Sequence, residues 1–166
     1  MIRRAKLKDA VEIAKIYNYY VRNSVVTFEE APVEPEEMKE RIQAVVSKFP
    51  WLVYVEEGKI IGYAYAIEWK LRSAYKLTVE TAIYLKHEVT EKGTGSLLYK
   101  ELIRQLIEMN IHAIIGGVSL PNKVSVGLHE KLGFKKVAEF KEVGFKFNRW
   151  IDVGYWELIT DTTNEQ

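Results

Sequence analysis

Cysteine is absent from this chain of 166 residues. Its absence excludes disulfide bonds, zinc sites with cysteine ligands and an acyl intermediate carried on a cysteine. Charge of one sign is also missing, because 24 lysines and arginines balance 23 aspartates and glutamates, which leaves a formal net charge of +1. So small a net charge gives no general electrostatic reason to expect binding to nucleic acid or to a membrane surface.

Long hydrophobic runs are missing as well. No window approaches the ~18 apolar residues that a membrane-spanning helix needs, and no apolar run follows the charged residues 1–9 as it would in a secretory signal. We therefore expect a cytoplasmic protein. Apolar residues make up 48% and charged residues 28% of the chain, which is an ordinary globular composition. We expect a single domain over residues 1–160 and a frayed tail over residues 161–166.

The pattern of apolar residues predicts an α/β (α+β) fold, with a mixed central sheet of about six or seven strands flanked by about four helices. Strands are expected where apolar residues alternate, and helices where they recur every three to four residues. In chain order we predict a strand at 2–5, helices from about 9 and from 34 to 48, a hairpin of strands at 51–55 and 60–67, a strand at 79–85, a helix from 97, a strand at 112–119, a helix after Asn122 and strands at 134–143 and 150–159.

The centre of the chain reads as a strand, a glycine turn over residues 93–96 and a helix. The predicted apolar face of this helix consists of Leu98, Leu102, Ile103, Leu106, Ile107 and Met109. A glycine turn that opens a helix directs free backbone N–H groups at one spot, where a phosphate is the expected guest. No lysine follows Gly95, which excludes a P-loop, and Leu98 replaces the third glycine of a dinucleotide fingerprint. A tight turn without any ligand is equally compatible with this spacing.

Glu80 lies in the middle of the predicted strand, on the opposite face from Val79 and Thr81. A carboxylate among apolar neighbours is costly unless it is paired or useful, and desolvation raises its pKa toward the working range of a general base. The alternative is an ion pair with Arg72 or with a lysine. Further along, Asn122 is a predicted helix N-cap, and Gly116 and Gly117 indicate either a bulge or the close approach of a ligand.

This order of elements, with a glycine turn after the fourth strand, resembles the GCN5-related N-acetyltransferase (GNAT) superfamily. The motif of that family is Gln/Arg-x-x-Gly-x-Gly/Ala, whose backbone amides hold the pyrophosphate of acetyl-CoA. Here the motif reads Thr90-Glu91-Lys92-Gly93-Thr94-Gly95. Thr90 lacks the long side chain of the motif, and Glu91 adds a negative charge that Lys92 can offset. The resemblance therefore implies acetyl-CoA binding that is modestly weakened.

The match is closer to the phosphinothricin acetyltransferases and their methionine sulfoximine-acetylating relatives. It covers nearly the whole chain and rests on the joint order of residues 50–53, 62–65, 72–75, 78–80, 120–122, 128–130 and 143–153. It implies a homodimer that moves an acetyl group from acetyl-CoA directly to the α-amino group of a small amino-acid analogue, without a metal. The alternatives are an N-terminal acetyltransferase for proteins or peptides, for which the aromatic loops look too closed, and a CoA-binding module without catalysis.

The resemblance also implies roles for individual residues. Glu80 matches the catalytic base, and His129 matches a histidine that acts as an acid or in a proton relay, although a structural histidine is the commoner reading of a lone one. Residues implied to bind acetyl-CoA are Ile83, Tyr84, Leu85, Glu91, Lys92, Gly93, Thr94, Gly95, Ser96, Asn122 and Ser125. Residues implied to surround the substrate are Phe28, Lys70, Leu71, Arg72, Tyr75, Thr81 and Ala82, with Lys146 and Asp152 as further candidates.

Overall fold

The computed structural model describes residues 1–89 and 93–161. Seven strands form one mixed sheet in the order β1-β2-β3-β4-β5-β7-β6, which confirms the predicted α/β fold and its order of elements. The strands are β1 (Ile2–Arg4), β2 (Trp51–Glu56), β3 (Lys59–Glu68), β4 (Thr78–Leu85), β5 (Ala113–Leu120), β6 (Lys135–Lys146) and β7 (Arg149–Ile159). The helices are α1 (Ala10–Asn23), α2 (Pro35–Val46), α3 (Thr94–Glu108) and α4 (Lys123–Lys131).

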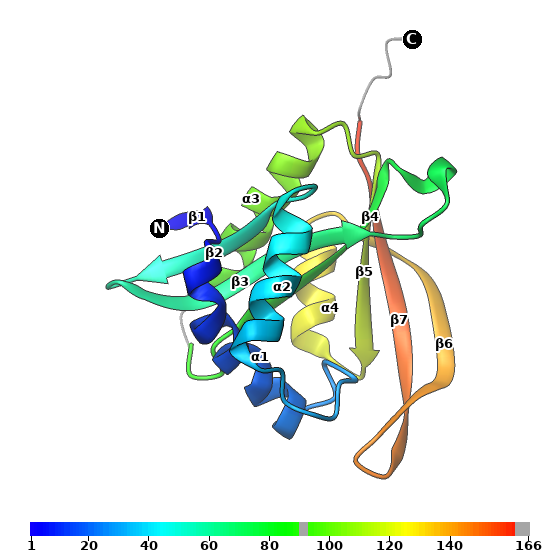
Figure 1. The fold of residues 1–166 in the computed structure, drawn as a ribbon. Helices are drawn as coiled ribbons and strands as arrows, with labels where there is room; N and C mark the ends of the chain where they lie inside the picture. The colour runs from blue at the N-terminus through cyan, green and yellow to red at the C-terminus, as the bar shows by residue number, and fades with distance from the viewer. Residues whose placement is uncertain (90–92, 162–166) are drawn as a thin grey trace.

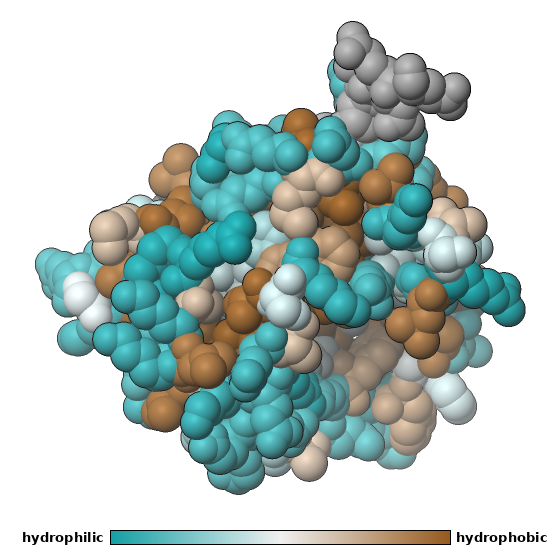
Figure 2. All heavy atoms as spheres, turned by 45° about the horizontal axis from the view of Figure 1, so that its top comes forward, coloured by the Kyte–Doolittle hydropathy of each residue, from teal (hydrophilic) through white to brown (hydrophobic). Residues whose placement is uncertain are grey.

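Helices cover both faces of the sheet, with α1 and α2 in front and α3 and α4 behind in Figure 1. Because side chains alternate along a strand, each strand contributes to two cores. Trp51 and Val53 of β2 pack in the core that contains α1 and α2. Leu52 between them packs in the core that contains α3. Figure 2 shows hydrophobic side chains interspersed with hydrophilic ones on one outer face.

The sheet splits between β4 and β5, its one parallel pair (Figure 1). Their pairing extends only from Thr78 opposite Ala113 to Thr81 opposite Gly116. Beyond this point β4 stays paired with β3, and β5 stays paired with β7 as far as Leu120. The two strands therefore diverge and leave an opening between their facing edges.

The hydrogen bonds between β3 and β4 show which backbone groups of β4 face this opening. The Lys86 N–H donates to the Ile61 carbonyl, and the Trp69 N–H donates to the Thr78 carbonyl. Even-numbered residues of β4 therefore turn their backbone groups toward β3, because such groups alternate along a strand. Ile83 and Leu85 turn theirs toward the opening, past the last pairing with β5.

Two predicted boundaries are wrong. The α3 helix begins at Thr94, so Thr94, Gly95 and Ser96 form its first turn and do not precede it. Strand β6 continues to Lys146 and does not end at residue 143, because an irregularity between Phe140 and Gly144 bends the strand without ending its pairing with β7. The added residues bring the β6–β7 hairpin against the loop that follows α1.

The predicted apolar face of α3 is confirmed as far as Leu106. Its buried members are Leu98, Leu102, Ile103 and Leu106, whereas Ile107 and the C-cap Met109 are 43% and 39% exposed. Some expectations cannot be compared with the structure. Those for Thr90, Glu91 and Lys92, and for the tail beyond Asp161, lie outside the described residues. Among the described residues, no helix is both long enough and apolar enough to span a membrane.

Candidate functional site

Two cavities meet at Glu80. The larger, of about 570 Å³, fills the opening between β4 and β5 and extends to α3 and α4. The smaller, of about 430 Å³, lies between the loop after α1 and the β6–β7 hairpin. Four residues line both cavities, namely Val26, Glu80, Gly117 and Ser119. A ligand in one cavity can therefore meet a ligand in the other beside the Glu80 carboxylate.

The half-buried Glu80 carboxylate has the surroundings of a general base. Burial raises its pKa above the ordinary glutamate value, and the positive charge of Lys70 opposes this shift. Within residues 1–89 and 93–161, no cationic side chain lies within ion-pair distance of it, so the alternative of an ion pair with Arg72 is not observed. A half-buried carboxylate with a raised pKa and no ion-pair partner accepts a proton more readily than an ordinary glutamate does.

His129 on α4 is only 4% exposed, and both of its ring nitrogens have partners. Its Nδ1 lies 2.7 Å from the Ser125 carbonyl oxygen, and its Nε2 lies 3.1 Å from the Tyr99 hydroxyl. Because a carbonyl can only accept, Nδ1 carries the proton and Nε2 accepts from Tyr99. Burial also lowers the pKa of His129, so the ring is neutral at pH 7.

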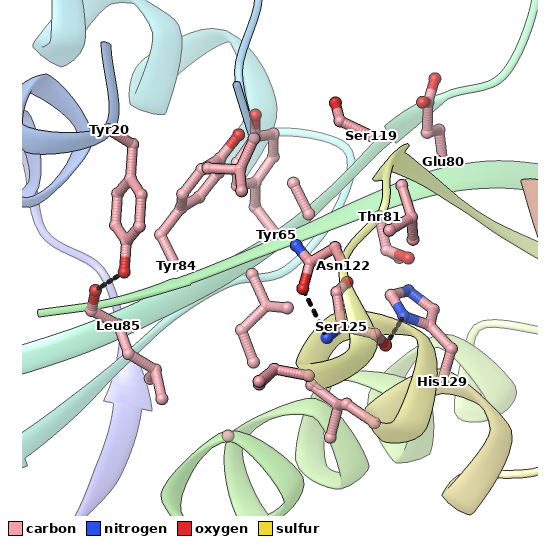
Figure 3. A pocket seen from close by; sticks show the side chains of 18 of the residues that line it. Tyr20, Tyr65, Glu80, Thr81, Tyr84, Leu85, Ser119, Asn122, Ser125 and His129 are labelled. Atoms are coloured by element: carbon pink, nitrogen blue, oxygen red, sulfur yellow. Dashed lines mark hydrogen bonds between the residues drawn. The ribbon is translucent and has the colours of Figure 1, made fainter. Parts of the chain in front are cut away.

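The hydrogen-bond chain from His129 continues to β4. The Tyr99 hydroxyl lies 2.7 Å from Thr81 Oγ1, which in turn lies 3.2 Å from the Ile115 carbonyl oxygen. The three side chains in this hydrogen-bonded network, His129, Tyr99 and Thr81, are all at least nine-tenths buried. This network joins α4, α3 and β4 at the wall of the larger cavity, which His129 and Thr81 line. Figure 3 shows His129 bonded to Ser125.

Both glycines in β5 make room for site residues. The predicted bulge is not observed, whereas the close approach of a ligand stays a prediction, since Gly117 lines both cavities. A Cβ built on Gly116 would lie 2.3 Å from His129 Nε2. A Cβ built on Gly117 would lie 3.4 Å from Glu80 Oε1 and 3.2 Å from the Tyr155 ring. The closeness comes from side chains of the protein itself, and β5 pairs with β7 without a register shift.

Most of the described residues predicted to bind acetyl-CoA surround the larger cavity. Those in its lining are Ile83, Tyr84, Leu85, Gly95, Asn122 and Ser125. Asn122 is confirmed as an N-cap, because its Oδ1 accepts the Ser125 N–H at 3.0 Å. The start of α3 is set by Gly93, whose φ of +111° suits a glycine. Thr94 and Ser96 lie in that first turn, outside the lining.

This donor set fits a ligand with phosphates and an amide-bearing arm. The N–H groups of the first turn of α3 have no partners within the helix and suit an anion. The N–H groups of Ile83 and Leu85 face the opening, where they can pair with an extended ligand as a strand would. Among the described residues, no group of three or more metal-binding side chains occurs.

The residues predicted to surround the substrate fall into two groups. Ala82 and Thr81 line the larger cavity, and Phe28 lines the smaller one. The remaining four lie on the loop between β3 and β4, outside both linings, namely Lys70, Leu71, Arg72 and Tyr75. Among them, Leu71 is 92% and Tyr75 is 41% exposed. The role of these four residues in substrate binding stays a prediction.

The two further candidates also lie outside both linings. The Lys146 ammonium donates to the backbone carbonyls of Ser24 and Thr27. The Asp152 carboxylate accepts from Lys141 and from the Glu142 N–H.

Several residues of the site were not predicted from the sequence. Tyr20 donates to the Leu85 carbonyl at 2.6 Å and lies at the opposite end of the larger cavity from Glu80 (Figure 3). Tyr65 faces the same cavity, and burial raises its pKa to about 12. Tyr99, which bonds His129 but lines neither cavity, had a usable signal, namely a hydroxyl within an apolar helical stripe. Ser119 and Tyr155 had none, because their approach to Glu80 depends on the pairing of distant strands, β4 with β5 for Ser119 and β5 with β7 for Tyr155.

Comparisons with known proteins agree on one family. The family model for the acetyltransferase (GNAT) domain matches residues 2–154. A phosphinothricin N-acetyltransferase of Streptomyces viridochromogenes is 36% identical over 94% of this chain and 85% of the relative. An L-methionine sulfoximine/L-methionine sulfone acetyltransferase of Pseudomonas paraeruginosa is 31% identical over 98% of this chain and 95% of the relative.

A solved structure is similar along almost the whole chain. It is a GNAT superfamily phosphinothricin acetyltransferase from Sinorhizobium meliloti in complex with acetyl-CoA. The TM-score is 0.92 at 34% sequence identity, and the match covers 96% of this chain and 87% of that one.

Proposed function

This chain belongs to the GNAT acetyltransferase family, and we propose that it moves an acetyl group from acetyl-CoA to the α-amino group of a small amino-acid analogue. The observation that carries the proposal is the Glu80 carboxylate, half-buried and without an ion-pair partner among the described residues, at the junction of two cavities. One cavity offers backbone donors for the acetyl donor. The other is small enough to select an amine.

In the donor half, the opening between β4 and β5 takes the pantetheine arm, and the first turn of α3 takes the pyrophosphate. Acetyl-CoA supplies an activated acetyl thioester. The N–H groups of Ile83 and Leu85 face the opening and can polarise the thioester carbonyl, as oxyanion donors do. Most of these contacts are to backbone groups, and they depend little on side-chain identity.

In the acceptor half, Glu80 removes a proton from the substrate ammonium, and the free amine attacks the thioester carbon directly. The carboxylate is suited to this step because its raised pKa brings it closer to that of the amine. His129 lines the larger cavity, and its Nε2 is held by Tyr99. It contributes by fixing the wall of that cavity, and it relays to the departing thiolate the second proton, which the nitrogen loses as the amide forms.

The names of the relatives support the substrate class. Phosphinothricin, methionine sulfoximine and methionine sulfone are small amino-acid analogues with a free α-amino group, and these names belong to proteins at 36% and 31% identity. The smaller cavity, with Phe28, Val153 and Tyr155 in its lining, has room for such a molecule.

We further propose that two copies associate through the β6–β7 hairpin. Its outer surface exposes several large apolar side chains, a composition typical of an interface core. These are Val137, Phe145, Phe147 and Trp150, all more than half exposed.

The test is release of free thiol from acetyl-CoA with a panel of amines, for wild type and Glu80→Gln. The panel contains phosphinothricin, methionine sulfoximine, methionine sulfone, free methionine and a short peptide. Glutamine keeps the size of the side chain but cannot accept the proton. We expect turnover with one or more of the three analogues, and a loss of roughly 10²–10⁴-fold in kcat in the variant.

Two results would count against the proposal. Turnover with the peptide alone would favour an N-terminal acetyltransferase. Tight acetyl-CoA binding without turnover of any amine would favour a binding module.

A further inference from the structure

Lys146, near the end of β6, is a buried cation that the proposed reaction does not use. It is 2% exposed, and its Nζ donates to the backbone carbonyls of Ser24 and Thr27, both at 2.8 Å. Burial lowers its pKa, while the more distant charges of Glu30 and Glu29 raise it. Since a buried charge is costly, the position of Lys146 calls for a reason beyond packing.

A second contact joins the same part of β6 to the same loop. The Phe28 ring occupies the space beside Gly144, where a built Cβ would lie 2.3 Å from the ring atom Cζ. Gly144 and Lys146 lie two residues apart, so both point to one side of the strand. Together they hold residues 24–28 from the side of the hairpin.

The other side of the loop is fixed by α1 and α2. The Tyr17 hydroxyl lies 2.7 Å from Thr27 Oγ1, and Arg41 holds the Glu29 carboxylate with two hydrogen bonds of 2.9 and 2.6 Å. The loop is therefore tied to three elements. Between these ties lie Val26 and Phe28, which line the smaller cavity together with Glu80.

We propose that Lys146 is a positioning residue for the amine acceptor, because it holds the Val26–Phe28 wall of the smaller cavity at a fixed distance from Glu80. This inference rests on the proposed function, since it assigns the smaller cavity to the acceptor. It does not require Lys146 to touch the substrate. Removal of its two hydrogen bonds frees the loop, and the acceptor then loses a preformed wall.

The first test compares Lys146→Met with wild type in steady-state kinetics. Methionine keeps the length of the side chain and removes its donors. We expect KM for the amino-acid acceptor to rise roughly tenfold, while KM for acetyl-CoA stays within about twofold, because Val26 is the one residue of the held loop in the lining of the donor cavity. Lys141→Met is the matched control, because Lys141 lies on the same strand but is 71% exposed in its side chain. It should leave both constants unchanged.

The second test asks whether Lys146 acts through the loop. In a Phe28→Ala background, the effect of Lys146→Met on acceptor KM should largely disappear, because the wall is already gone. Amide hydrogen exchange should rise at least severalfold in residues 24–29 of Lys146→Met and stay unchanged in α3. If Lys146→Met does not fold, Gly144→Ala, which displaces the Phe28 ring, should raise the same KM.

Unchanged amide exchange in residues 24–29 of Lys146→Met would refute the proposal that Lys146 holds this loop. Faster exchange with an unchanged acceptor KM would overturn its link to the acceptor, as would equal rises in both KM values. If wild type acetylates no amine, the proposed function fails, whereas the exchange result still decides whether Lys146 holds the loop.

Discussion

At the scale of single residues, the ionisation of Glu80 should set the acid limit of activity. The carboxylate must be unprotonated to act, and burial raises its pKa, so kcat/KM should fall as the pH drops through a value above that of an ordinary glutamate. Lys70 lowers this pKa. Lys70→Met should therefore move the acid limb to higher pH, whereas Lys76→Met on the same loop should not. Coincident profiles of kcat/KM against pH for wild type and Lys70→Met would refute this account.

Tyr99 gives a second prediction for a single side chain. Tyr99→Phe leaves the Nε2 of His129 without its donor and the hydroxyl of Thr81 without its tyrosine partner, both in buried surroundings. We expect the free energy of unfolding to fall by about 1–3 kcal/mol in urea titrations. Tyr75→Phe, at a 41% exposed tyrosine, makes the same chemical change and should cost less than about 0.5 kcal/mol. Equal losses in the two variants would show that the buried chain contributes nothing.

At the scale of elements, Gly116 on β5 and Gly127 on α4 allow a matched comparison of glycine-to-alanine changes. Gly116→Ala puts a Cβ within 2.3 Å of His129 Nε2, so β5 and α4 must separate or the ring must move. We expect a loss of about 1–3 kcal/mol and lower activity. Gly127→Ala on α4 has nothing within 4 Å of the new Cβ and should stabilise the helix by about 0.5–1 kcal/mol. Thermal unfolding and thiol release of both variants would measure the difference.

Local pattern predicted the elements well, because each depends on its own residues. The alternation around Glu80 predicts β4, and Asn122 predicts the start of α4 through a bond to a residue three positions later. The exposure of Ile107 and Met109 was not predictable, since it depends on which parts of α3 the rest of the fold covers. The approach of Tyr155 to Glu80 depends on strands far apart in sequence, and no local pattern records it.

At the scale of the whole molecule, the exposed apolar side chains of the β6–β7 hairpin lead to a prediction about assembly. Phe145 and Trp150 are 51% and 61% exposed, and their rings pack against each other at 4.9 Å between centroids. We expect light scattering to give the mass of a dimer for wild type and of a monomer for Trp150→Glu, because a buried unpaired charge is costly. Lys135→Glu, at an exposed residue of the same hairpin, should stay dimeric. A monomeric wild type would refute this mode of association.

The split between β4 and β5 has a consequence for how the amine substrate can change during evolution. Most of the donor cavity is encoded by one continuous part of the chain, from β4 through α4, and only Tyr20, Val26, Tyr65 and Ile67 of its lining precede that part. Phe28 of the smaller cavity is encoded before it, and the β6–β7 hairpin after it. A descendant gene can exchange the flanking segments and gain a new amine while most of the donor cavity is kept. Chimaeras that join segments of two relatives at residues 34 and 134 would test whether such an exchange changes the amine that is acetylated.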